Sequence, residues 1–335
     1  MKSALITGIT GMVGSHLCDY LLKNTNWKIY GLCRWRSPLD NVEHLLNEAN
    51  KKNSRLKFIY GDLNDFSSLL DAISESKPNY VFHLAAQSYP QTSFTEANLT
   101  FNTNIIGTYN LLNSINKCKI NPLIHVCSSS EVFGKVSKDK LPIDEKCNFH
   151  PASPYAISKV GTDLIGRYFF EAFDMRVMVT RMFTHTGPRR GDVFAESSFA
   201  KQIALIEAKK IKPVIKVGNL QSLRTFADVR DAVRGYFMLL TRNPKPGEAY
   251  NIGGSFSCTI GQMLDFLLSL SKEKKIKVVE DKKRLRPIDA DLQVPDTSKF
   301  YNHTKWKPKF TFEKTMLDLL NYWRQKVKKS NFLDR

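Results

Sequence analysis

Three glycines close to the start of the chain constrain its fold more than any other feature. Gly8, Gly11 and Gly14 lie between a short apolar segment, residues 3–7, and a segment whose apolar residues recur with helical spacing. At a strand–turn–helix junction, the first glycine permits a tight turn, the second lets a pyrophosphate approach the backbone, and the third allows close helix–strand packing, while the helix N-terminus faces the anion. The spacing differs from G-x-G-x-x-G, but the position at the first junction predicts a dinucleotide-binding turn. A purely structural turn is the alternative.

Segments typical of strands and helices then alternate along the first half of the chain. Strands are expected at residues 29–33, 57–60, 80–84, 123–127 and 176–181, and helices at residues 65–76, 102–117 and 153–173. Strands that alternate with helices of this length predict a parallel sheet covered on both faces. We therefore expect the α/β class, with a Rossmann-like doubly wound parallel sheet.

The pattern changes near residue 182, beyond which turn residues and irregular stretches become more frequent. Helices are expected near residues 196–209, 228–242, 259–271 and 312–328, and short strands at 214–217 and 276–279. We divide the chain into a dinucleotide-binding Rossmann domain, residues 1–182, and a smaller C-terminal α/β lobe, residues 183–335. The lobe is expected to be interleaved with the first domain, because some later segments return to it.

Composition narrows the functional classes. The 335 residues carry a net charge of +18, but the lysines are spread over the chain without an aromatic-interleaved basic motif, which favours an anionic small substrate over nucleic acid. Six cysteines without C-x-x-C spacing predict free thiols rather than disulfides or a metal site. No apolar run is suited to a signal peptide or reaches the ~18–20 residues that span a bilayer, so we expect a cytoplasmic protein with no membrane partner.

The end of the second strand indicates which cofactor is bound. Arg34 and Arg36 stand where an acidic residue would bind the ribose 2′-hydroxyl of NAD, and arginine at this place favours the 2′-phosphate of NADP. Surface arginines without a ligand are the alternative. The residues expected to contact NADP are Gly8, Gly11, Met12, Val13, Gly14, Arg34, Arg36, Asp62, Leu63, Ala85, Ala86 and Gln87, together with Tyr155 and Lys159.

A hydroxyl, a carboxylate, a phenol and an amine follow within about thirty residues. Tyr155 and Lys159 are four residues apart, so on a helix they share one face and the ammonium can lie beside the phenol. A neighbouring positive charge lowers a phenol's pKa, which makes Tyr155 a proton shuttle candidate. Ser129 supplies a hydroxyl and Glu131 a second, separate base. We expect these four residues to be catalytic, although Glu131 could also be a carboxylate at a helix start without a chemical role.

Together these residues resemble the extended short-chain dehydrogenase/reductases that act on nucleotide sugars and, within them, the GDP-mannose 4,6-dehydratases. The family resemblance is carried by His83 to Ser88 (His-Leu-Ala-Ala-Gln-Ser), Thr103 to Thr108, Ser129 to Gly134, Ser153 to Lys159 and Trp306 to Pro308. The narrower resemblance rests on Gly187 to Gly191, Val217 to Arg224, and Arg286-Pro287 with Asp291.

The resemblance implies an activity and a role for each catalytic residue. Tyr155 would take the proton of the sugar's C4 hydroxyl, Lys159 would assist it and hold the nicotinamide ribose, and Ser129 would bond the C4 oxygen. Glu131 would remove the C5 proton before water is lost from C6. The product would be a 4-keto-6-deoxy sugar nucleotide, made from GDP-mannose or a GDP-manno-heptose, with the cofactor recycled. The family implies a homodimer or homotetramer and a role in deoxysugar supply for surface polysaccharides.

The residues that the resemblance places on the substrate lie mainly in the second lobe, which would then bind the nucleotide sugar. They are Ser88, Ser130, Thr184, Arg190, Lys201, Asn219, Arg224 and Arg286. Arginines suit a diphosphate because they bind it with two parallel hydrogen bonds, and ordinary surface charges are the alternative.

Three positions depart from the dehydratase pattern. The family usually has threonine at Ser129, and serine keeps the hydroxyl. Trp35 interrupts an Arg-Arg-Ser run whose loop contacts a neighbouring subunit's cofactor in the family, which leaves a tetramer contact open. Thr184 replaces an asparagine that contacts the diphosphate, which favours an altered sugar or phosphate pocket.

Two alternatives to a dehydratase remain. A GDP-4-keto-6-deoxymannose reductase shares the fold and the Tyr–Lys pair, but consumes NADPH stoichiometrically. A non-catalytic NADP-binding protein would usually have lost Tyr155 or Lys159, and both are present.

Overall fold

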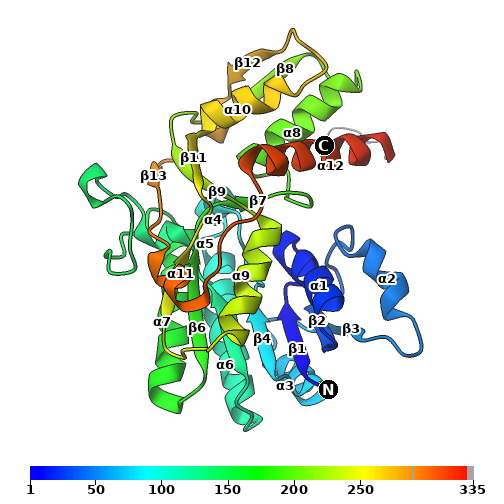
Figure 1. Cartoon of the computed structure of the whole chain (residues 1–335), viewed down its shortest axis with the longest axis vertical. Coiled ribbons are helices and arrows are strands. Elements are labelled where there is room, and N and C mark those ends of the chain that lie inside the picture. Colours follow the sequence, from blue (N-terminus) through cyan, green and yellow to red (C-terminus); the bar gives the residue numbers. More distant parts are fainter. Residues whose placement is uncertain (289, 330–335) are drawn as a thin grey trace.

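The computed structural model describes residues 1–288 and 290–329, and its largest element is a seven-stranded parallel sheet (Figure 1). The strand order is β10-β6-β5-β4-β1-β2-β3, and every neighbouring pair is parallel. The strands are β1 (Ser3–Thr7), β2 (Lys28–Cys33), β3 (Leu56–Tyr60), β4 (Tyr80–His83), β5 (Leu123–Cys127), β6 (Val177–Met182) and β10 (Ala249–Ile252). The predicted Rossmann-like doubly wound sheet is confirmed. Strand order reverses between β1 and β4, the place where such sheets bind ligands.

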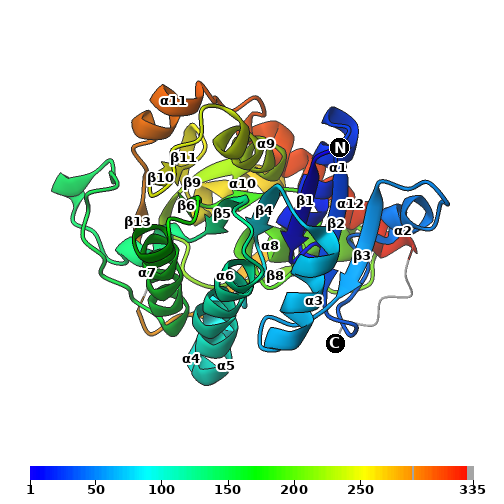
Figure 2. The ribbon, with the colours of Figure 1, turned by 90° about the horizontal axis from the view of Figure 1, so that it is seen from below.

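Helices cover both faces of this sheet, as the view from below shows (Figure 2). One face carries α1 (Met12–Asn24) and α9 (Val229–Thr241), and the other carries α3 (Phe66–Ser76), α6 (Gly107–Lys117) and α7 (Pro154–Phe173). The strands are nearly continuous buried runs, because side chains on both faces lie under helices.

The expected helix over residues 102–117 differs in the structure. Helical backbone begins earlier, in α5 (Ala97–Phe101), passes through a π-helical turn, η1 (Asn102–Ile106), and continues as α6. The turn brings Asn104 into the interior, where its amide donates to the Ser158 hydroxyl at 2.8 Å and to the Gln87 carbonyl at 2.9 Å. Such π-turns often lie at functional sites. Here the turn ties the chain after β4 to α7.

The second lobe contains two small sheets and its own core. Its elements are β7 (His185–Thr186), α8 (Ala195–Glu207), β8 (Val214–Val217), β9 (Leu223–Asp228), β11 (Phe256–Thr259), α10 (Ile260–Ser269), β12 (Lys277–Glu280), η4 (Lys282–Arg284), β13 (Leu292–Gln293) and α12 (Phe312–Lys329). One sheet runs β11-β9-β13 with β7 beside β9, and the other pairs β12 with β8. Helix α12 packs along α8, and Trp323 donates from its indole to the Ser197 hydroxyl at 2.8 Å (Figure 1).

The remaining elements are short. They are α2 (Glu43–Ala49), α4 (Pro90–Thr95), η2 (Ser130–Phe133), η3 (Lys138–Lys140) and α11 (Ser298–Thr304). None of the helices within residues 1–288 and 290–329 combines the length and apolar character needed to cross a bilayer. All six cysteines are free thiols. In the described part of the chain, no three His, Cys, Asp or Glu side chains gather as metal ligands would.

A buried ion pair fixes α7 to strand β6 of the sheet. Arg181 of β6 donates to both carboxylate oxygens of Asp163, at 2.8 and 3.1 Å, and its guanidinium lies over the Phe149 ring. The two side chains are only 10% and 6% exposed. The geometry is bidentate, so removing one partner would leave the other charge buried and unpaired.

We expect Asp163→Ala to lower the free energy of unfolding by about 3–5 kcal/mol, because Arg181 would lose its buried counterion. The matched control is Glu171→Ala on the same helix, whose pair with Arg167 spans 3.7 Å and is more than 60% exposed on both sides. That change should cost less than about 1 kcal/mol. Urea unfolding followed by circular dichroism measures both values, and equal losses would contradict the assignment.

Candidate active site

A deep cleft lies where the two lobes meet, at the carboxyl ends of β1, β4 and β5. Its volume is about 1630 Å³, and its walls come from both lobes. All but one of the expected site residues line it, namely Gly8, Gly11, Met12, Val13, Gly14, Arg34, Asp62, Leu63, Ala85, Ala86, Gln87, Ser88, Ser129, Ser130, Glu131, Tyr155, Lys159, Thr184, Arg190, Lys201, Asn219, Arg224 and Arg286. The exception is Arg36.

The glycine turn forms a tight backbone cradle at one end of this cleft. Gly8 has φ +72°, and a Cβ at that position would lie 2.8 Å from the backbone of Ala85. A Cβ on Gly14 would lie 2.3 Å from the Gly8 carbonyl oxygen. Only glycine fits at either place, and α1 begins at Met12 with its N-terminus facing the cleft. The residues present therefore fit the pyrophosphate of a dinucleotide.

The arginines after β2 differ in position. Arg34 lines the cleft, whereas the guanidinium of Arg36 lies 5.1 Å from the ring centre of Trp35, outside the cleft wall. Trp35 is 75% exposed. The structure thus brings Arg34 to the site and leaves Arg36 beside an exposed aromatic ring.

The catalytic candidates converge from β5 and α7. Ser129 caps the η2 turn by accepting a hydrogen bond from the Glu131 amide at 3.2 Å. This bond fixes the Ser129 side chain relative to the backbone of Glu131. Helix α7 begins at Pro154, with Ser153 as its N-cap, which places Tyr155 in the first turn. The Ser129 side chain is hydrogen-bonded to Tyr155.

Lys159 lies one turn further along the same helix. Its ammonium donates to the Cys127 carbonyl at 2.8 Å, and its own carbonyl accepts from Ser128 at 3.1 Å. The spacing predicted from sequence is therefore realised on one face of α7. Both Tyr155 and Lys159 are buried, at 8% and 5% exposure.

Burial changes the expected ionisation of this pair. The pKa of Tyr155 is raised, not lowered, because burial disfavours the phenolate more than its surroundings favour it. The Ser129 hydrogen bond and the Arg190 charge both act to lower that pKa. Burial also lowers the pKa of Lys159. The expectation that a neighbouring ammonium would dominate was wrong for this arrangement, since the loss of hydration is the larger effect.

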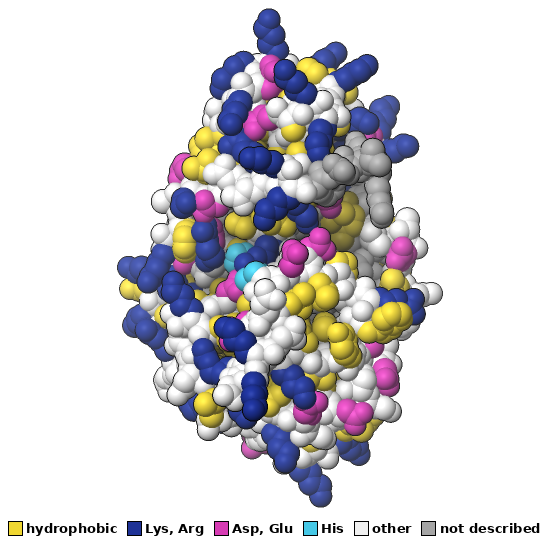
Figure 3. Space-filling view, turned by 90° about the vertical axis from the view of Figure 1, so that its right-hand side faces the viewer, with side chains coloured by type: hydrophobic (Ala, Val, Ile, Leu, Met, Phe, Trp, Pro, Cys, Tyr) yellow, Lys and Arg dark blue, Asp and Glu magenta, His cyan; other side chains and the backbone are white. Residues whose placement is uncertain are grey.

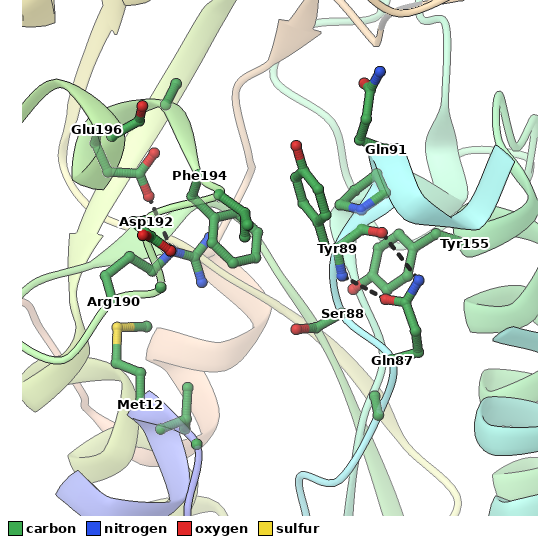
Figure 4. A pocket seen from close by; sticks show the side chains of 18 of the residues that line it. Met12, Gln87, Ser88, Tyr89, Gln91, Tyr155, Arg190, Asp192, Phe194 and Glu196 are labelled. Atoms are coloured by element: carbon green, nitrogen blue, oxygen red, sulfur yellow. Dashed lines mark hydrogen bonds and ion pairs between the residues drawn. The ribbon is translucent and has the colours of Figure 1, made fainter. Parts of the chain in front are cut away.

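The wall contributed by the second lobe is rich in paired charges. Arg190 donates to Glu196 at 3.1 Å and stacks over Phe194 at 3.3 Å from the ring centre. Lys201 pairs with Asp192 at 3.0 Å. Figure 4 shows Arg190, Asp192, Phe194 and Glu196 facing Ser88, Tyr89 and Gln91 across the cavity, with Tyr155 next to Gln87 and Met12 below Arg190.

Arg286 and Arg224 complete the substrate side. Arg286 lies 3.8 Å from Glu131, and Arg224 donates to the Ala290 carbonyl. Asn219 donates to the Ser222 hydroxyl at 3.0 Å, and Thr184 accepts the Ala227 amide at 2.9 Å through its carbonyl. The cleft therefore gathers every substrate candidate.

Positive charge dominates the cleft wall. Of the described lining residues, eleven are Lys or Arg and five are Asp or Glu. Figure 3 shows that Lys and Arg also spread over both lobes rather than forming one patch. An anionic ligand is favoured inside the cleft because low-dielectric walls strengthen the field there.

Several lining residues were missed by the sequence reasoning. Tyr89 and Phe194 form an edge-to-face pair across the cavity, with ring centres 5.7 Å apart. Gln91 reaches the Lys283 carbonyl at 3.4 Å, and Arg284 donates to Ser198 at 3.1 Å. The basic run from Lys282 to Arg286 was the one available signal for this side of the cleft.

Comparison with known proteins shows which family the chain belongs to. The family model described as GDP-mannose 4,6 dehydratase matches residues 5–319. The chain belongs to that family. A GDP-mannose 4,6 dehydratase of Drosophila melanogaster is 31% identical over 95% of this chain and 85% of its own length. A GDP-6-deoxy-D-mannose reductase of Pseudomonas aeruginosa is 28% identical over 96% and 97%.

Solved structures give the same fold. RMD from Pseudomonas aeruginosa complexed with NADPH is 27% identical, covers 98% of this chain and 100% of its own, and has a TM-score of 0.82. DesIV, a dTDP-glucose 4,6-dehydratase of Streptomyces venezuelae with NAD bound, has a TM-score of 0.84 over 98% and 99% of the two chains. At 22% identity it supports the fold alone. The chain thus shares its fold with proteins whose structures contain a bound nicotinamide cofactor.

We expect Ser129→Ala to lower kcat about 10²- to 10³-fold, as losing a donor to a reacting oxygen does. Activity that needs ionised Tyr155 rises with pH. Loss of the Ser129 hydrogen bond raises the Tyr155 pKa further, so that rise should move to higher pH. A pH–rate profile measures both effects. Ser129→Thr keeps the hydroxyl and should retain the wild-type profile, and an unshifted profile for Ser129→Ala would contradict the proposed contact.

Proposed function

We propose that this protein is an NADP-dependent nucleotide-sugar 4,6-dehydratase that converts GDP-mannose, or a GDP-manno-heptose, to the 4-keto-6-deoxy sugar nucleotide. The single observation that carries the proposal is the place of Glu131. It lines the same cleft as Ser129 and Tyr155, and its amide donates a hydrogen bond to the Ser129 hydroxyl. A second base beside the Tyr–Ser pair supplies what elimination needs beyond oxidation.

Oxidation at C4 would use Ser129, Tyr155 and Lys159. Tyr155 accepts the proton of the C4 hydroxyl, and Ser129 donates to the oxygen as it becomes a ketone. Lys159, held on the Cys127 carbonyl, keeps a positive charge on the face of α7 that carries the phenol. A bound NADP+ would take the C4 hydride and later return it to C6.

Elimination would use Glu131, with Ser130 beside it. The ketone acidifies the C5–H bond, and Glu131 accepts that proton. The electron pair forms the C5–C6 double bond and expels the C6 hydroxyl, which leaves as water with the proton from Glu131. Ser130 is buried next to Glu131 and is assigned to the departing oxygen. Return of the hydride to C6 and of one proton to C5, which balances the proton that Tyr155 took from the C4 hydroxyl, would complete the reaction. The net change is then the loss of one water, with no net oxidation or reduction.

The nucleotide diphosphate is assigned to the second lobe. Arg190, Lys201, Arg224 and Arg286 line the cleft there, and guanidinium groups bind phosphate oxygens in pairs. Ser88, Thr184 and Asn219 are assigned to the sugar and phosphates with them. The positive excess of the wall supports an anionic substrate.

A GDP-4-keto-6-deoxymannose reductase is the second candidate. The observation in its favour is similarity, because the Pseudomonas aeruginosa reductase is 28% identical over 96% of this chain, close to the 31% over 95% of the Drosophila dehydratase. A reductase needs the same Tyr155 and Lys159. A non-catalytic NADP-binding protein is disfavoured because both residues are present and lie together on α7.

The decisive experiment incubates the protein with NADP+ and either GDP-mannose or GDP-manno-heptose, and measures product mass and absorbance at 340 nm. A dehydratase gives a product lighter by one water and no net absorbance change. Steady oxidation of NADPH on the 4-keto sugar, with both GDP-sugars inert, would establish the reductase instead.

The preference for NADP is assigned to Arg34. We expect Arg34→Ala to raise the KM for NADP+ about 10- to 100-fold with little effect on NAD+, because one charged hydrogen bond to the 2′-phosphate is lost. Arg36→Ala is the matched control, since Arg36 lies outside the cleft wall. Steady-state kinetics with both cofactors measure the changes. Equal losses for NADP+ and NAD+ would refute the assignment.

We also propose that α6 and α7 pack against a second copy of the chain. Exposed apolar side chains lie along them, including Tyr109, Ile157, Leu164 and Tyr168. Apolar patches of this kind mark protein interfaces. A homodimer is the simplest assembly, and a homotetramer through the Trp35 loop stays a prediction. The cytoplasmic location and the role in polysaccharide sugar supply also stay predictions.

A further inference from the structure

Glu131, the proposed C5 base, forms an ion pair with a residue of the other lobe. Its Oε1 lies 3.8 Å from Nη1 of Arg286. The two side chains are 18% and 25% exposed, and both line the cleft. The carboxylate assigned to the sugar and the guanidinium assigned to the diphosphate are therefore paired with each other.

The Glu131 side of the pair is rigid. Its amide donates to Ser129, and the turn closes when the Gly134 amide donates to the Glu131 carbonyl at 3.1 Å. Ser129 is in turn hydrogen-bonded to Tyr155. Glu131 therefore stays beside the Tyr–Ser pair when its counterion changes.

The Arg286 side belongs to a basic segment that reaches across the cleft. The segment follows β12 and includes η4 (Lys282–Arg284), and Lys283 and Arg284 also line the cleft. The Lys283 carbonyl accepts a hydrogen bond from Gln91 of α4 at 3.4 Å. Arg284 is turned to other partners, Ser198 at 3.1 Å and Asp281 at 3.8 Å.

The Glu131–Arg286 pair is suited to exchange. Its separation is near the outer limit for an ion pair, and partly exposed pairs are weak. A phosphate offers a guanidinium two parallel charge-assisted hydrogen bonds, which are stronger. A diphosphate in this cationic cleft would therefore compete with Glu131 for Arg286. When the guanidinium turns to the diphosphate, the Glu131 Oε1 that faced it is left to accept a proton.

We propose that Arg286 is a positioning residue that couples diphosphate recognition to the base Glu131. It holds the carboxylate in an ion pair until the diphosphate takes the guanidinium, and Glu131 is then free to accept the C5 proton. The inference rests on the proposed function and adds to it a reason why the nucleotide diphosphate governs chemistry at the sugar. Since coupling is reciprocal, the carboxylate must also weaken diphosphate binding.

The test is a double-mutant cycle on GDP binding, measured by calorimetry with the protein saturated with NADP+. We expect Glu131→Gln to tighten GDP binding about three- to tenfold, because residue 131 then no longer competes with the diphosphate for Arg286. In an Arg286→Gln background the same change should leave GDP affinity nearly unaltered. Arg286→Lys keeps the positive charge but loses the guanidinium that can donate two parallel hydrogen bonds. In that background Glu131→Gln should therefore tighten GDP binding less than it does in the wild-type protein.

Arg284→Gln is the matched control, because it removes the same charge from the same segment without a contact to Glu131. In that background Glu131→Gln should still tighten GDP as it does in wild type. Equal tightening in the Arg286→Gln, Arg286→Lys and Arg284→Gln backgrounds would overturn the coupling, because it would reflect only the general field of the cleft. The coupling would also be overturned if Glu131→Gln, made in the otherwise wild-type protein, did not tighten GDP binding.

Two readouts together distinguish the coupling from a simple contact between an arginine and the diphosphate. Arg284→Gln should raise the KM for the nucleotide sugar and leave the effect of Glu131→Gln on GDP affinity unchanged. Arg286→Gln should raise that KM and abolish the effect of Glu131→Gln on GDP affinity. Failure of wild type to bind GDP would sink the proposed function itself. Tight GDP binding without the Glu131 effect would leave that function standing and reject only the coupling.

Discussion

The cleft depends on one geometric constraint, the parallel order of the large sheet. Parallel strands place all their carboxyl ends at one edge, so the turn after β1, the segment after β4 and the Ser-Ser-Ser-Glu run after β5 meet there. The close contact of Gly8 and Gly14 with neighbouring backbone lets β1, α1 and β4 approach at the reversal of strand order. A larger residue at either position would push the helix from the sheet and open the cradle.

Several cations of the cleft wall are paired with acidic side chains of the same wall. Arg190 has Glu196, Lys201 has Asp192, and Arg286 has Glu131, each pair within the wall. Pairing limits the desolvation penalty of bringing several cations together. The surplus of cations still favours an anionic ligand. Each pair is also a competitor that such a ligand must displace, so the acids of the wall set how strongly the substrate is held.

Local pattern was sufficient for the sheet and for most of the cleft. The strand at residues 3–7, the glycine turn and the four-residue spacing of Tyr155 and Lys159 depend on neighbours in sequence, and the structure reproduces them. Three features depend on long-range contacts and were out of reach. The π-turn at Asn104 needs Gln87 and Ser158 as partners, and burial reverses the pKa shift expected for Tyr155. Phe194 and Tyr89 are more than 100 residues apart in sequence and meet only through the packing of the folded chain.

The division of the site between lobes bears on how one fold serves several reactions. In the proposed reaction, oxidation at C4 draws on Ser129, Tyr155 and Lys159, which come from the turn after β5 and from α7 and are buried there. Glu131 lies on the same turn, yet its counterion comes from the segment after β12. Changes in that segment can therefore alter the state of the second base without disturbing the first reaction. In the proposed reaction, the state of Glu131 would therefore depend on Arg286, which lies more than 150 positions away along the chain and reaches the catalytic turn through an ion pair of 3.8 Å.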